Sequence, residues 1–351
     1  MASDEFELIR RYFWSLGTAG APPAEAAAPT AFSAIRLGIG DDAALLAVPP
    51  GEALVTSVDT LVEGVHYPED TFPEDVGYRA LAVAASDLAA MGATPLACTL
   101  ALTLPAVDDL WLQAFSEGLG QACRAFGLPL AGGDTTRGPA TVITLQVFGS
   151  CPENRALRRD GARAGDQVCV SGTLGDAAAA LAMLEDRWRP AVAGADDDSG
   201  ADDGSGTGVG SGAGDSPGSA WPPGPEVSGA LLERFHRPTP RLALGERLRG
   251  IASAAIDVSD GLLADLGHIA AASGVAIALE SRALPLSPAL AAAGEPGRAW
   301  ALTGGDDYEL AFTLPAGEAV PAGCTRIGEV RAGDGLSVDG EPANAGGYRH
   351  F

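Results

Sequence analysis

The chain has 351 residues, enough for two domains of ordinary size, and its 22 basic residues, all arginine, oppose 46 acidic ones. A net charge of −24 leaves no basic face for nucleic acid, and a chain without lysine has no GxxxxGK phosphate loop. No apolar run reaches the roughly 20 residues of a membrane span. The five cysteines form no CxxC pair, which argues against zinc or a disulfide framework and favours reduced thiols in the cytoplasm.

The first half of the chain alternates helical and strand-like segments. The expected helices are at 4–16, 74–91 and 108–126. The expected strands are at 43–48, 53–58, 97–104 and 141–150. This order predicts an N-terminal helix and loose connector within 1–31, followed by an α/β or α+β domain over 32–152.

The second half predicts another domain over 153–351. A turn-rich segment at 155–166 leads into a strand at 167–172 and a helix at 175–188, and regular structure resumes at 231–248. Residues 194–228 are mostly Gly, Ser, Asp and Pro and offer almost nothing to bury. Such a segment does not offset its ordering entropy, so a disordered surface insertion is expected there.

Short acidic segments recur where apolar runs end, each beside Gly or Ser. They are GIGDDAALL (38–46), SVDTLVEGVH (57–66), SDLAAMGA (86–93), AGGDTTRG (131–138), IDVSDGLLADLGH (256–268) and TGGDDYEL (303–310). Buried carboxylates are rare unless paired, and carboxylate oxygens are the ligands that magnesium prefers. The pattern therefore predicts one shared magnesium pocket, and bound magnesium in so acidic a chain implies an anionic ligand such as nucleotide phosphate.

Asp87 is the most telling of these carboxylates. A helix over 74–91 places it on a stripe that is otherwise apolar, with Val76, Ala80 and Val83. A carboxylate on such a stripe is costly unless it is paired or bound to metal. The alternative, a helix rotated to expose Asp87, would expose the stripe as well.

Other segments leave alternatives open. AGGDTTRG suits a phosphate loop, with free backbone N–H groups, a carboxylate and Arg137. Asp41 fits either a metal site or an Asp-rich turn, and His66 is either a catalytic or a structural histidine. Ser259 or Asp260 could cap the helix that follows, but capping would not explain Asp257.

Together with HRPTPR (236–241) and GGYRHF (346–351), these motifs in this order resemble the thiamine-monophosphate kinase family. The resemblance spans the chain apart from 19–31 and 194–228. It implies a two-domain aminoimidazole ribonucleotide synthetase-like fold, in which the N-terminal sheet domain forms a homodimer and the C-terminal domain has a mixed sheet. It also implies phosphorylation of thiamine monophosphate to thiamine diphosphate, with ATP as co-substrate and several Mg²⁺ ions between the domains.

The resemblance also implies roles for individual residues. The implied magnesium ligands are Asp41, Ser57, Val58, Asp59, Asp87, Asp134, Asp257 and Asp260. The implied ATP contacts are Gly133, Asp134, Arg159 and Ser259, and the implied substrate contacts are His66, Asp306 and Tyr348. Val58 stands where the family often has Thr, which leaves a backbone carbonyl as its ligand, and Asp306 stands where the family usually has Glu.

The acceptor of this reaction is a phosphate oxygen of low pKa, so no general base is expected, and alignment with charge neutralisation carries direct in-line transfer. The alternatives are another ATP-using enzyme of the same superfamily and a non-catalytic nucleotide- or cation-binding relative. A selenide-activating relative would carry a reactive N-terminal Cys with a Lys, whereas this chain has no Lys and no Cys before Cys98.

Overall fold

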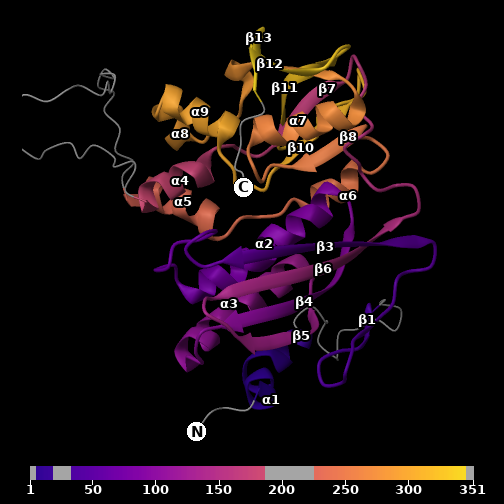
Figure 1. The fold of residues 1–351 in the computed structure, drawn as a ribbon. Coiled ribbons are helices and arrows are strands. Elements are labelled where there is room, and N and C mark those ends of the chain that lie inside the picture. The colour runs from indigo at the N-terminus through magenta and orange to yellow at the C-terminus, as the bar shows by residue number, and fades with distance from the viewer. Residues whose placement is uncertain (1–4, 19–32, 186–224, 345–351) are drawn as a thin grey trace, which may run out of the picture.

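The computed structural model describes residues 5–18, 33–185 and 225–344, which form two packed domains (Figure 1). The N-terminal domain is built on a four-stranded sheet and the C-terminal domain on a seven-stranded sheet. No helix among the described residues is long and apolar enough to cross a membrane.

The first described element is α1 (Glu5–Leu8), which continues as a π-helical turn over Ile9–Phe13 and a 3₁₀ turn over Trp14–Thr18. Tyr12 and Phe13 are buried, and the Tyr12 hydroxyl donates to Asp109 at 2.7 Å. The strand expected at 43–48 is wrong in extent. Only β2 (Leu45–Leu46) forms there, because the strand it pairs with, β1 (Ile35–Leu37), is also short.

The N-terminal sheet has the order β3-β6-β4-β5. Its strands are β3 (Glu52–Val62), β6 (Val142–Pro152), β4 (Thr94–Leu104) and β5 (Leu130–Arg137). The phosphate loop expected in AGGDTTRG is wrong, because these residues form β5, which runs parallel to β4. Glycine is needed for this pairing, since a Cβ on Gly133 would lie 1.9 Å from the Leu100 carbonyl oxygen.

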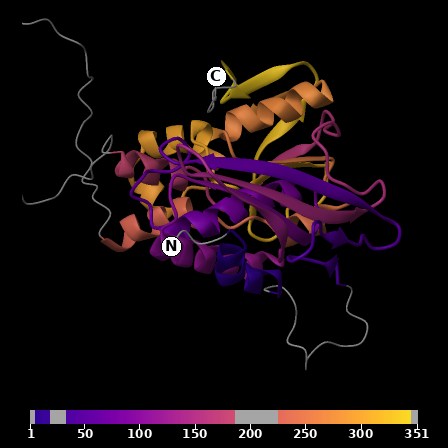
Figure 2. The ribbon, with the colours of Figure 1, turned by 60° about the horizontal axis from the view of Figure 1, so that its bottom comes forward.

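Two helices, α2 (Pro73–Ala90) and α3 (Asp109–Phe126), cover one face of this sheet. Asp108 caps α3 by accepting from the backbone N–H groups of Leu110 and Trp111. The other face of the sheet is open in the described chain, where Leu54 and Val58 are 51% and 59% exposed. Figure 2 shows the long strands of this sheet, in purple and magenta, running across the molecule.

The C-terminal sheet is mixed and has the order β13-β12-β9-β11-β7-β10-β8. Its strands are β7 (Gln167–Ser171), β8 (Ala254–Asp257), β9 (Ala276–Leu279), β10 (Leu310–Leu314), β11 (Cys324–Arg331), β12 (Gly335–Val338) and β13 (Glu341–Ala343). Its helices are α4 (Asp176–Leu184), α5 (Pro225–His236), α6 (Leu242–Leu248), α7 (Leu262–Ser273), α8 (Pro288–Ala292) and α9 (Glu295–Thr303), with a 3₁₀ turn at Ser281–Ala283.

Most of the insertion expected at 194–228 lies outside the described residues. Its last residues, 225–228, belong to α5, so the expectation of disorder is wrong for them. They can form a helix because α5 continues into an apolar segment in which Leu231 and Phe235 are buried against α4.

The two domains share a hydrophobic core at the C-terminal end of α2. Ala89 and Ala90 pack there with Leu244 and Leu248 of α6 and with Phe312 of β10. A Cβ on Gly245 would lie 2.1 Å from the Ala89 carbonyl oxygen, so glycine lets α6 approach α2 closely. Helix α2 therefore has neighbours on nearly every side, and the residues along it face both domains.

Candidate active site

A cavity of about 420 Å³ lies between the two domains. The end of β3 and one side of α2 form one wall, and the loops at 257–260 and 305–308 form the other. It brings together residues expected from the sequence: Asp59, His66, Asp87, Asp257, Ser259, Asp260 and Asp306. The site is thus built where secondary-structure elements end, and both domains contribute to it.

The carboxylates of this cavity concentrate negative charge. Burial, and then the charges of Asp87 and Asp257, raise the pKa of Asp59 to about 7. Burial and the charge of Asp87 likewise raise the pKa of Asp257. The Ser57 hydroxyl donates to Asp87 and so joins β3 to α2 beside the cavity. These clustered negative charges suit a cationic or protonated partner.

The loop that carries Ser259 and Asp260 is held by Asp265, which the sequence analysis missed. Its Oδ2 atom accepts from the backbone N–H groups of Ser259, Asp260 and Gly261 at 3.1, 3.2 and 3.1 Å. Gly261 is the residue that caps α7, so neither Ser259 nor Asp260 does, and both line the cavity instead. Burial, followed by the charges of Asp257 and Asp260, raises the pKa of Asp265 to about 7.

His66 lies on the N-terminal side of the cavity. Its Nδ1 atom accepts from the backbone N–H of Val62 at 3.0 Å, which fixes the ring. Next to it, Tyr67 is 4% exposed, and its hydroxyl has no hydrogen-bond partner in the described part of the chain. Leu181 and Leu184 of α4 add an apolar wall. This side of the cavity suits a ligand with an apolar ring.

Asp306 enters the cavity from the C-terminal domain. Arg79 of α2 donates to its Oδ1 atom at 2.7 Å, and the Tyr308 hydroxyl donates to the same oxygen at 2.8 Å. The sequence analysis missed both Arg79 and Tyr308. The only sequence signal for Arg79 was a charged residue next to the alanines and leucines of α2, and the burial of nearly all sides of this helix appears only in the structure.

A second pocket, of about 510 Å³, lies on the other side of Asp87. Ser57, Asp87 and Arg159 line it, so the structure brings these three expected site residues together. Val58 does not join them. Side chains alternate along a strand, and Val58 is 59% exposed on the open face of the sheet. Only its backbone remains available as a ligand.

Asp41, Gly133 and Asp134 line a third pocket, of about 600 Å³. Phe13 and Trp14 from the start of the chain complete its apolar side. The expectation of a single shared pocket is therefore wrong within one chain, because the expected residues line separate pockets. The remaining expected site residue, Tyr348, lies outside the described residues.

The register of the N-terminal sheet explains this separation. Asp59 of β3 is opposite Leu145 of β6, Leu145 is opposite Leu100 of β4, and Leu100 is opposite Gly133 of β5. Asp59 and Asp134 thus lie at opposite edges of the sheet, roughly 14 Å apart at about 4.8 Å per strand. In the described residues, no three His, Cys, Asp or Glu side chains are grouped so as to hold a metal ion by themselves.

The fold and these loops place the chain in a known class. Residues 40–151 match the model of the AIR synthase related protein, N-terminal domain, which confirms the expected fold class. The chain is 42% identical to a thiamine-monophosphate kinase of Escherichia coli K12, over 100% of this chain and 99% of the relative.

Solved structures agree with this match. A thiamine-monophosphate kinase from Stenotrophomonas maltophilia K279a superposes with a TM-score of 0.73 at 44% identity, covering 88% of this chain and 92% of that one. AaThiL complexed with AMPPCP and TMP superposes with a TM-score of 0.73 at 33% identity, covering 89% of this chain and 92% of that one. The chain belongs to the thiamine-monophosphate kinase family.

Proposed function

We propose that this chain uses ATP to phosphorylate thiamine monophosphate, giving thiamine diphosphate. The observation that carries the proposal is the interdomain cavity, which is lined together by Asp59, Asp87, Asp257, His66 and Asp306. Its relatives support the proposal, because one of them, AaThiL, has been solved with AMPPCP and TMP. The cavity has the charge for a metal–nucleotide complex on one side and an apolar wall for a ring on the other.

The same residues would supply some of the ligands of magnesium, although among the described residues no three of them are grouped to hold an ion by themselves. Asp59, Asp87, Asp257 and Asp260, with the Ser57 hydroxyl, form a set of hard oxygen donors around the cavity. Burial, and then the crowding of negative charge, raise the pKa values of Asp59 and Asp257, and a divalent cation would relieve that crowding. When bound, magnesium would offset the charge of the phosphate oxygens.

The chain's own residues would position the substrates. Arg159 lies beside Ser57 and Asp87, where a guanidinium can hold a phosphate of ATP, and Ser259 lies in the loop that Asp265 fixes. His66 and Asp306 would hold thiamine monophosphate, while Leu181 and Leu184 exclude water from its rings. The attacking group is an ionised phosphate oxygen, so direct in-line transfer requires alignment rather than a general base.

We propose further that the active form is a homodimer, with each site shared between the two chains. The open sheet face with Leu54 and Val58 supports this, because the C-terminal domain packs against α2 and no other described segment covers that face. A two-fold axis along the strands, between two such faces, would bring the β5 edge of one chain beside the β3 edge of the other. The partner's Asp41, Gly133 and Asp134 would then complete the site that contains Asp59 and Asp87.

Location in the cytoplasm is part of the proposal. All five cysteines are free, and four of them are buried, as suits a reducing compartment.

Substrate choice tests the proposed function. The purified chain, with ATP and Mg²⁺, is offered thiamine monophosphate or free thiamine, and the products are separated by chromatography. We expect thiamine diphosphate from the monophosphate and no turnover of free thiamine. Equal use of free thiamine, or no product from the monophosphate, would contradict the proposal.

A further inference from the structure

Arg79 is a buried cation that joins three segments at the wall of the interdomain cavity. It is 2% exposed, its Nη2 donates to Asp306 at 2.7 Å, and its Nη1 donates to the Phe235 carbonyl at 2.5 Å. Its guanidinium also lies over the Phe235 ring, 4.2 Å from the centroid. Burial opposes the positive charge, but the neighbouring Asp306 and Tyr308 raise the pKa of Arg79. A buried charge of this kind is tolerated because it is paired.

The partner of Arg79, Asp306, stands on a constrained turn. Asp306 and Tyr308 both have left-handed φ angles, of 68° and 52°, which non-glycine residues rarely adopt. The backbone N–H of Asp306 donates to the Ser259 carbonyl at 2.9 Å, and that of Tyr308 to the Val258 carbonyl at 2.8 Å. The turn is thereby tied to the loop that carries the expected ATP contact.

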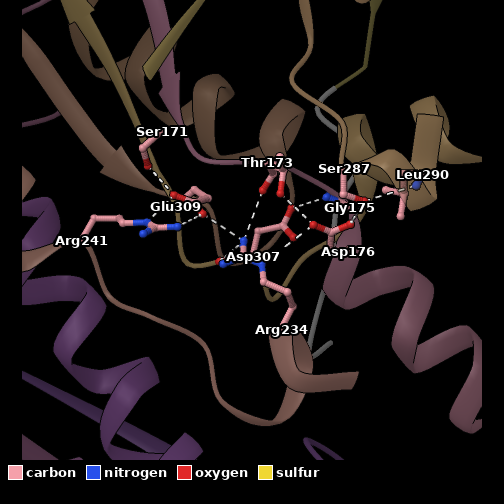
Figure 3. A network of polar contacts seen from close by, with 10 residues as sticks. All are labelled: Ser171, Thr173, Gly175, Asp176, Arg234, Arg241, Ser287, Leu290, Asp307 and Glu309. Atoms are coloured by element: carbon pink, nitrogen blue, oxygen red, sulfur yellow. Dashed lines mark hydrogen bonds and ion pairs between the residues drawn. The ribbon is translucent and has the colours of Figure 1, made fainter. Parts of the chain in front are cut away.

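Three side chains anchor the residue after the turn (Figure 3). Glu309 is fully buried, and its carboxylate accepts from Arg234 at 2.9 Å, from Ser171 at 2.5 Å and from Arg241 at 2.6 Å. The turn therefore has little freedom to move, and the direction of the Asp306 carboxylate depends on what holds its side chain.

Within the described part of the chain, both side-chain hydrogen bonds to Asp306 go to Oδ1. Arg79 and Tyr308 supply them, and the Asp306 side chain keeps 27% of its surface exposed where it lines the cavity. The Oδ2 atom therefore keeps its lone pairs for a ligand, while the charge of the carboxylate is balanced by Arg79. Without that balance, the carboxylates across the cavity would repel Asp306.

We propose that Arg79 is a positioning residue for substrate recognition, which fixes Asp306 so that its second oxygen accepts from the amino group of the substrate's pyrimidine ring. This inference rests on the proposed function. Arg79 itself need not touch the substrate. Its planar fork holds the Asp306 oxygen and the Phe235 carbonyl at once, and lysine cannot reproduce this geometry.

Steady-state kinetics of R79K, R79M, D306N and R79M/D306N test the inference. We expect each Arg79 variant to raise KM for thiamine monophosphate about tenfold or more, as the loss of a charge-assisted contact would, with KM for ATP unchanged. D306N should show a similar rise, and the double variant should be no worse than the D306N single variant, because both changes remove one interaction. R237M is the matched control, since Arg237 pairs with Asp75 of α2 at 2.6 Å but does not line the cavity.

Thermal melting separates recognition from folding, and R79K keeps a cation in the buried position if R79M is unstable. A normal KM for thiamine monophosphate in R79K, an equal rise in both KM values, or fully additive effects in the double variant would overturn the inference alone. An inactive wild-type chain would overturn both the inference and the proposed function.

Discussion

Asp59 and Asp134 occupy the two opposite edge strands of one sheet, nearly level with each other across four strands. Asp59 belongs to the interdomain cavity, whereas Asp134 lines a pocket beside the start of the chain. If both carboxylates serve one reaction, the register requires that they come from different chains.

Subunit mixing tests this shared site. D87N and D134N are each expected to be inactive as homodimers, because loss of one such electrostatic element commonly costs about 10²-fold or more in rate. After subunit exchange, half of the dimers are mixed, and one of the two sites in each mixed dimer is intact. The mixture should therefore recover about a quarter of wild-type activity.

The matched control mixes D87N with D59N, whose altered residues line the same cavity of one chain. No mixed dimer then contains an intact site, so no recovery is expected. Recovery in the control, or none when D87N is mixed with D134N, would contradict the shared site.

Glu309 is the central acceptor of the buried network in Figure 3. E309Q leaves Arg234 and Arg241 facing a neutral group, and removal of one partner from a buried ion pair costs about 3–5 kcal/mol. We expect a loss toward the lower end of that range, because both arginines are partly exposed. Chemical denaturation measures it.

E329Q is the control for this prediction, because Glu329 pairs with Arg331 at the surface, where both side chains are largely exposed. Its free energy of unfolding should change by less than about 0.5 kcal/mol. Equal effects of E309Q and E329Q would show that the buried network is not what holds the 305–309 turn.

Asp307 gives the fold a pH dependence. Burial raises the pKa of Asp307 well above its usual value, although the Gly175 N–H and the charge of Arg234 lower it. The folded chain therefore holds the proton more tightly than an unfolded chain, whose Asp pKa is about 3.9, and this residue's contribution to stability falls as pH rises.

D307N has no proton to lose and keeps an oxygen for the Gly175 N–H, which donates to Asp307 at 2.7 Å. Between about pH 5 and about pH 8 the variant should lose less unfolding free energy than the wild type. If the unfolding free energies of the two proteins changed equally with pH, this account of Asp307 would be refuted.

Asp265 sets the shape of the loop at 259–261 through three backbone N–H groups. D265A leaves these donors unsatisfied, so stability should fall by about 1–3 kcal/mol and kcat should fall with it. D265N keeps an accepting oxygen and should recover part of both. Normal kcat in D265A would mean that the loop does not depend on this carboxylate.

The sequence predicts much of the N-terminal domain because local patterns and tertiary packing agree there. The bounds of the helices predicted at 74–91 and 108–126 agree with those of α2 and α3 to within one residue. The strand predicted at 141–150 begins one residue before β6 does. β5 is predicted wrongly, because its Gly-Gly-Asp segment has the composition of a turn. Close pairing with β4, which glycine permits, overrides that preference.

The candidate site is predictable in its parts but not in their arrangement. Asp87 follows from helical periodicity, and the structure places it at the cavity as expected. Arg79 does not follow, because a single apolar stripe was assumed for a helix that packs on nearly all sides. The separation of Asp59 from Asp134 depends on strand order, which no local pattern encodes.

Tracing the transferred phosphoryl group tests the central claim most directly. ATP labelled with ¹⁸O in its γ-phosphoryl group is incubated with the wild-type chain, Mg²⁺ and thiamine monophosphate. The mass of each product is then measured by mass spectrometry. The account predicts thiamine diphosphate that carries the label in its terminal phosphoryl group, with ADP as the other product. Unlabelled thiamine diphosphate, or labelled inorganic phosphate without thiamine diphosphate, would contradict it.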